Sequence, residues 1–96
     1  LAEEVADAAT RARTLGEAVD VAPLLATLEL TKSADMPDQV RAKLHKITGY
    51  VLRDAGRAMD AMQHLTRALQ LHDGCGVKKD IERLATDLKK QAVARR

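Results

Sequence analysis

The sequence predicts an all-α fold in which about five helices form antiparallel helix-turn-helix pairs. Apolar residues recur at intervals of three and four along most of the chain, which is the period of a helix buried on one face. A chain of 96 residues with two Pro and five Gly has room for few turns. Its hydrophobic content of 46 % is mostly Ala, Leu and Val, with one Tyr and no Phe or Trp. A core without large aromatic residues predicts that stability is modest or depends on neighbouring repeat units.

The central hairpin is predicted over residues 42–76, as two helices joined by a tight turn at Gly56. Each helix carries one apolar stripe: Val40, Leu44, Ile47 and Val51 on the first, and Met59, Met62, Leu65 and Leu69 on the second. We expect both stripes, Met59 and Met62 included, to pack in the core. Two such helices with a short connection fold back against each other.

Small residues predict how closely these helices pack. Gly49 lies in mid-helix, where it costs about 1 kcal/mol relative to Ala. That cost is reasonable if a second backbone approaches there. Ala61 and Ala68 lie on one face of the second helix and offer the opposing surface.

The spacing of these residues resembles a tetratricopeptide repeat. Residues in the register of that pattern are Gly49, Gly56, Ala61, Leu65 and Ala68, while His45, Thr48, Leu52 and Asp73 depart from it. The resemblance covers about a third of the chain and implies a right-handed superhelix with a binding groove. It also implies that residues 77–94 form a capping helix.

The remaining elements complete a single domain over 1–96, divided into 1–34, 37–75 and 77–94. The first segment reads as a helix over 1–14 and a second helix that begins at about Val21 or Ala22, because Pro23 suits a first helical turn. We expect that second helix to bury Leu24, Leu25, Leu28 and Leu30. Pro37 is expected in the first turn of the next helix, with Asp35 or Met36 near the cap. The last helix carries Val77, Ile81, Leu84 and Leu88 on one face. A first residue other than Met suggests a fragment of a longer protein.

Charge divides the chain unevenly. Residues 1–40 carry eight acidic and three basic residues, net −5, and residues 41–96 carry six acidic and thirteen basic residues, net +7. The formal total of +2 conceals this asymmetry, which is more informative than the total.

The first candidate site is a basic stripe on the first helix of the hairpin. Its residues span roughly an 80° arc, about 110° from the apolar stripe: Lys43, Lys46, Tyr50 and Arg53. In the resembled family the first helices line the groove that holds a peptide. The resemblance therefore implies an acidic segment or a C-terminal carboxylate as the ligand, bound by charge-assisted hydrogen bonds. The alternative is a solvated helix face.

The second candidate is a phosphate-binding surface on the last helix. Its basic residues are Lys78, Lys79, Arg83, Lys89, Lys90, Arg95 and Arg96, to which Arg41 and Arg57 could add. Asp80, Glu82 and Asp87 are interleaved and could pair with these bases. Because no aromatic residue is available to stack on bases, a solvated capping helix is the favoured interpretation.

Metal binding and catalysis have little support in the sequence. His45, His64, His72 and Cys75 lack zinc-ligand spacing and are expected to be independent surface residues. We find no catalytic triad and no glycine-rich phosphate loop, so no catalytic residue, metal or cofactor is predicted. One unpaired Cys and the lack of a long apolar run predict an intracellular protein, cytoplasmic or nuclear, without membrane contact.

The predicted function is protein–protein interaction, as a scaffold or adaptor module that binds a peptide or helix of a partner, and not as an enzyme. The first alternative is a compact helical bundle that binds nucleic acid through its basic C-terminal half. The second alternative is a self-association module, which residual apolar surface on 1–34 would support.

Overall fold

The computed structural model describes residues 2–32 and 36–94. Those residues form five α-helices and no strand: α1 (Ala2–Thr14), α2 (Ala22–Thr31), α3 (Asp38–Asp54), α4 (Ala58–Leu71) and α5 (Lys78–Ala94), with a short 3₁₀ helix, η1 (Asp73–Cys75), before α5. The prediction of an all-α fold with about five helices is confirmed. Expectations for Leu1, Asp35, Arg95 and Arg96 fall outside the described residues.

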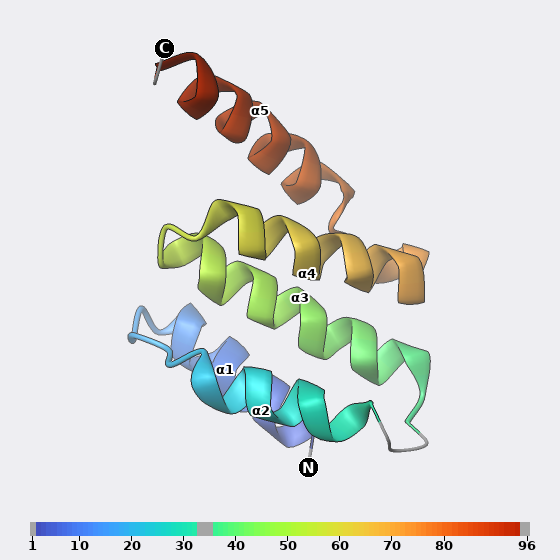
Figure 1. The fold of residues 1–96 in the computed structure, drawn as a ribbon. Coiled ribbons are helices and arrows are strands. Elements are labelled where there is room, and N and C mark those ends of the chain that lie inside the picture. Colours follow the sequence, from blue (N-terminus) through green and yellow to red (C-terminus); the bar gives the residue numbers. More distant parts are fainter. Residues whose placement is uncertain (1, 33–35, 95–96) are drawn as a thin grey trace.

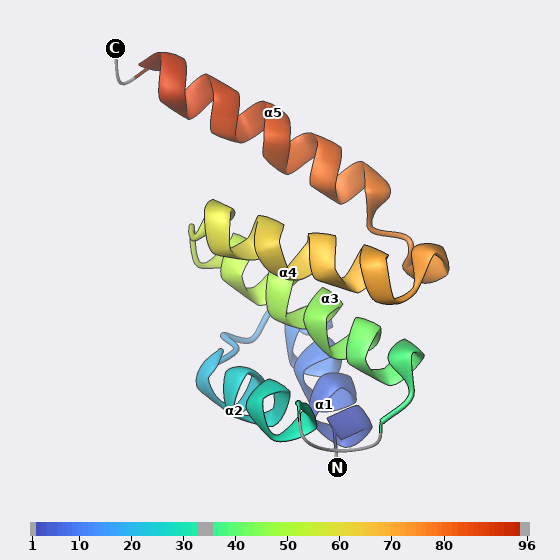
Figure 2. The same cartoon turned by 45° about the vertical axis from the view of Figure 1, so that its right-hand side comes forward.

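The central element of the fold is α3. It runs antiparallel to α4, while α1 and α2 cover its opposite side (Figure 1). The last helix, α5, packs on α4 and lies on the far side of α4 from α1 and α2 in both views (Figure 2). Its C-terminal end is the part farthest from the other helices. The body measures 45 × 28 × 21 Å along its principal axes.

The α3–α4 hairpin is as close at Gly49 as the sequence predicts. A Cβ at Gly49 would lie 2.7 Å from side-chain atoms of Leu65 and 3.2 Å from the Ala61 carbonyl oxygen. Ala61 and Ala68 are fully buried. Gly56 turns the chain with φ +81°, a conformation that side chains disfavour, but it faces open space and does not contact a second helix.

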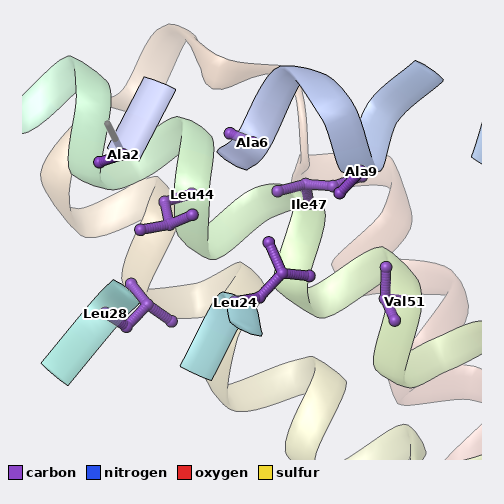
Figure 3. Packing of buried hydrophobic residues seen from close by; sticks show 8 residues of the cluster. All are labelled: Ala2, Ala6, Ala9, Leu24, Leu28, Leu44, Ile47 and Val51. Carbon is purple, nitrogen blue, oxygen red and sulfur yellow. The ribbon is translucent and has the colours of Figure 1, made fainter. Parts of the chain in front are cut away.

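Two apolar clusters meet on α3. The first joins α1, α2 and α3 through Ala2, Ala6, Ala9, Leu24, Leu28, Leu44, Ile47 and Val51 (Figure 3). The second joins α3, α4 and α5 through Leu52, Ala61, Leu65, Val77 and Leu84. The buried alanines of α1 are small, so this helix can pack closely on α3. Close packing of the helices therefore fills the core without large aromatic residues.

Several apolar residues that the pattern places in the core are exposed. Met59 is 69 % exposed because the first turn of α4 borders an open groove beside the C-terminal half of α5. On α2, Leu25 and Leu30 are exposed, at 36 % and 73 %, because the leucines of that helix lie on more than one side and Leu24 and Leu28 are the ones packed into the core with α1 and α3.

The start of α2 is confirmed at Ala22, with Pro23 in its first turn. Asp20 accepts a hydrogen bond from the Ala22 backbone N–H at 3.0 Å through its carboxylate, which satisfies a donor that the helix leaves free. Pro37 immediately precedes α3 instead of lying inside its first turn. Within the described part of the chain, every helix is too short or too polar to span a bilayer.

Replacing Gly49 with Ala should destabilise the fold. Helix propensity alone would stabilise such a variant by about 1 kcal/mol. The contact with Leu65 and Ala61 reverses the sign, and we expect a net loss of about 1 to 3 kcal/mol in the free energy of unfolding. Urea denaturation followed by circular dichroism measures it. A stabilised variant would contradict the close approach of α4 to α3.

Candidate nucleic-acid interface

The basic stripe predicted on α3 lies against acidic side chains of its own chain. Lys43 Nζ is 2.6 Å from Asp7 Oδ1 on α1 and 3.7 Å from Glu3 Oε1. At the other end of α3, Arg53 Nη1 is 3.2 Å from Asp80 Oδ1 on α5. The stripe thus joins three helices that are distant in sequence.

Tyr50 is the centre of this network. Its hydroxyl donates a hydrogen bond of 2.7 Å to Asp80 Oδ2. The guanidinium carbons of Arg13 and Arg53 lie 4.9 and 4.8 Å from the ring centroid, and Lys46 Nζ lies at 6.0 Å. Burial, the hydrogen bond to Asp80 and the Asp80 charge raise the pKa of Tyr50 to about 12, against the opposing influence of both arginines.

A cleft of about 330 Å³ between α1 and α3 is lined by Arg13, Lys43, Lys46 and Tyr50. Arg13 Nε lies 2.6 Å from Asp54 Oδ2, and Lys43 has its own acidic partners on α1. An incoming anion would have to compete with these carboxylates. Contact of this stripe with a partner stays a prediction. Its ion pairs give the stripe a second role, which is to hold α1 and α5 against α3.

Arg13 and Asp80 are members of this network that sequence reasoning missed. They lie 41 residues from Asp54 and 27 residues from Arg53, respectively. Helical periodicity relates residues within a few turns, so no local pattern could have identified such pairs.

The basic face of α5 differs in its surroundings. Lys78, Lys79, Arg83, Lys89 and Lys90 are exposed, and none of the five pairs with an acidic side chain of the described residues. At 100° per residue they occupy roughly a 140° arc, opposite the stripe of Val77, Ile81 and Leu84 that faces α4. Five cations therefore face solvent together.

The acids interleaved on α5 do not neutralise that face by the expected pairing along the helix. Asp80 is turned toward α3, where it accepts from Tyr50 and Arg53. In the chain as described, Glu82 and Asp87 form no ion pair with the bases of α5. The two added basic residues lie elsewhere: Arg57 pairs with Asp60, and Arg41 donates to the Thr31 carbonyl oxygen at 3.1 Å.

Two histidines are paired, contrary to the expectation of independent surface residues. His45 on α3 and His64 on α4 are half-buried, with their Nδ1 atoms 3.0 Å apart, so one ring donates to the other. Burial, and then the charges of His64, Arg67 and Arg41, lower the pKa of His45 to about 4. Burial also lowers the pKa of His64, although Asp60 opposes this.

The histidine pair predicts a loss of stability in acid. Because the folded-state pKa of His45 lies below the unfolded value of 6.5, the unfolded chain binds protons first. The free energy of unfolding should hence decrease as pH falls from about 6.5 toward 4. Urea titrations across this range measure the slope, and the double variant His45→Gln/His64→Gln should flatten it. An equally steep slope in that variant would contradict the assignment.

No cluster of three or more His, Cys, Asp or Glu that could hold a metal ion occurs in residues 2–32 and 36–94. The candidate sites in those residues are the basic face of α5 and the stripe on α3 whose charges are balanced by acidic side chains.

Comparison with known proteins finds a phage protein that is similar over most of this chain. Over 87 residues, 91 % of this chain, it is 63 % identical to the "Terminase, endonuclease subunit" of Escherichia phage P2. The chain spans 35 % of the length of that relative. No protein-family model and no solved structure matches.

This similarity corrects several expectations from the sequence. The proposed resemblance to tetratricopeptide repeats is wrong, because the relative is a terminase subunit. Gly49, Ala61 and Ala68 satisfy the packing needs of any close helical hairpin and are not diagnostic of that family. The scaffold or adaptor function is contradicted for the same reason. The expectation that the protein is not an enzyme is also contradicted, since the relative is named an endonuclease subunit.

Proposed function

We propose that this chain is a DNA-binding region of a phage terminase endonuclease subunit, and that it holds duplex DNA on the outer face of α5. The observation that carries the proposal is the group of five exposed cations on α5, none of which has an acidic partner among the described residues. The name of the relative supports it, because an endonuclease acts on nucleic acid.

The chemistry of the α5 face favours contact with phosphates. Lysine and arginine side chains neutralise backbone charge and release counterions, which provides affinity without reading sequence. The one aromatic residue of the chain, Tyr50, is engaged with Asp80 and is not available to stack on bases. We therefore infer duplex binding with weak sequence preference.

The name of the relative also supports proposals about the enzyme to which this chain contributes, its other subunit and its location. Cleavage is the activity of the whole subunit, to which this chain would contribute DNA contacts. The word subunit implies a terminase assembly, so a second partner would be another subunit of the same enzyme. Because the relative comes from an Escherichia phage, we place the protein in the bacterial cytoplasm, and the nuclear alternative is dropped.

Neutralising the α5 face should weaken DNA binding. In the triple variant Lys79→Gln/Arg83→Gln/Lys90→Gln, we expect affinity for a labelled duplex to fall at least about tenfold at low salt. The slope of log affinity against log salt should become less steep by about three, one for each phosphate that the variant no longer neutralises. Fluorescence anisotropy over a salt series measures both quantities.

A matched control removes the same charge elsewhere. Arg11, Lys32 and Arg67 are exposed on α1, at the end of α2 and on α4. Their triple change to Gln should leave the salt slope nearly unchanged. Equal losses in the two variants would show that net charge alone attracts DNA, and an unaffected α5 variant would overturn the proposal.

Self-association is a second candidate, favoured by apolar surface on the N-terminal helices. Leu15 and Leu30 are 72 % and 73 % exposed, and Leu25 lies on the same outer side of α2 as Ala22 and Ala26. Sedimentation velocity over a concentration series tests it. Leu25→Glu/Leu30→Glu should keep the chain monomeric if α2 mediates association, and a wild-type chain that is monomeric throughout would exclude it.

A further inference from the structure

The attachment of α5 to the body is narrow. Val77 and Leu84 are buried against α3 and α4, with Ile81 half-buried between them. Farther along, Gln91 and Ala92 are exposed, and the C-terminal end of the helix lies away from the other helices (Figures 1 and 2). The apolar stripe is fully buried only in the first half of α5, with Leu88 half-buried beyond it, and such a stripe allows the helix to roll about its axis because apolar contacts are not directional.

One polar anchor opposes that rolling. Asp80 is on the first turn of α5, to the side of its apolar stripe, and only 18 % of its side chain is exposed. Its two carboxylate oxygens each accept a separate donor from α3: Oδ2 from Tyr50 Oη at 2.7 Å and Oδ1 from Arg53 Nη1 at 3.2 Å. Two directional, charge-assisted bonds fix the rotation of the helix where the apolar stripe cannot.

The donors are themselves held in place. Arg53 lies over the Tyr50 ring, and so does Arg13, whose Nε lies 2.6 Å from Asp54 Oδ2. The anchor is consequently part of a network that reaches α1. Because these contacts hold Tyr50 and Arg53 in place, the two donors attach Asp80, and with it α5, rigidly to the body.

We propose that Asp80 is the positioning residue of the α5 interface: by binding Tyr50 and Arg53 it sets the rotation at which the five α5 cations face DNA. This inference rests on the proposed function and adds a determinant to it. Asp80 itself touches no DNA in this arrangement, because its carboxylate is turned toward α3.

The direction in which one substitution changes DNA affinity distinguishes a positioning role of Asp80 from simple charge repulsion. Removing an acidic charge from a DNA-binding helix should strengthen binding about two- to fivefold, as the loss of a repulsion worth about 1 kcal/mol or less. If Asp80 positions the helix, Asp80→Asn should weaken binding, by about threefold or more, in spite of that gain.

The experiment compares Asp80→Asn with Asp87→Asn, which removes the same charge from an exposed position on α5. Duplex affinity should fall in the first variant and rise in the second. A rise in both variants would overturn the proposal. Tyr50→Phe, which deletes one hydrogen bond without changing charge, should weaken binding in the same direction as Asp80→Asn and keeps the test decisive if the latter folds poorly.

Two further readouts do not depend on DNA. Tyr50 is the one aromatic residue of the chain, so its fluorescence reports on this site alone. A phenol that donates to a carboxylate is quenched, so emission should increase in Asp80→Asn and stay constant in Asp87→Asn. Amide hydrogen exchange along α5 should accelerate in Asp80→Asn and in Tyr50→Phe only.

These readouts separate the positioning role from the proposed function. If the wild-type chain binds no duplex DNA, the proposed function fails, while faster exchange along α5 in Asp80→Asn still supports the positioning of the helix. Unchanged exchange and unchanged tyrosine emission in that variant would overturn the positioning role, whatever the DNA affinity.

Discussion

The contact of Leu65 with Gly49 is the constraint on which the rest of the structure depends. It brings α4 against one side of α3 at a distance that no larger side chain would permit. The opposite side of α3 is then free for α1 and α2, and both apolar clusters share this one helix. Because α3 is covered on two sides, the basic stripe is confined to the flank between α1 and α5, while Arg41 and His45 contact α2 and α4 on the other flank.

That confinement explains why two groups of similar cations behave differently. On the flank of α3, Lys43 and Arg53 meet Asp7 and Asp80, and each such pair at the surface contributes up to about 1 kcal/mol. On α5 the bases point away from the body, where the described part of the chain offers no acid to meet them. Some basic residues of the C-terminal half therefore form ion pairs that join helices, and those on α5 form the proposed interface.

Sequence reasoning predicted the local features well. The hairpin, its close approach at Gly49, the start of α2 just before Pro23 and the apolar stripe of α5 all follow from patterns within a few turns. Periodicity identifies an apolar face but not whether a neighbour covers it, so Met59 and Leu30 were placed wrongly in the core. The same limit hid the acids that balance the α3 stripe, since they lie on other helices. The family resemblance failed because close hairpins of unrelated families need the same small residues.

If the proposed function is correct, DNA contacts the outer face of α5 and not the neutralised stripe of α3. Lysine acetylation with and without duplex DNA, read by mass spectrometry at each residue, distinguishes these two surfaces in one experiment. We predict that DNA protects Lys79, Lys89 and Lys90 from acetylation and leaves the reactivity of Lys43 unchanged. Protection of Lys43, with full reactivity along α5, would contradict the proposal.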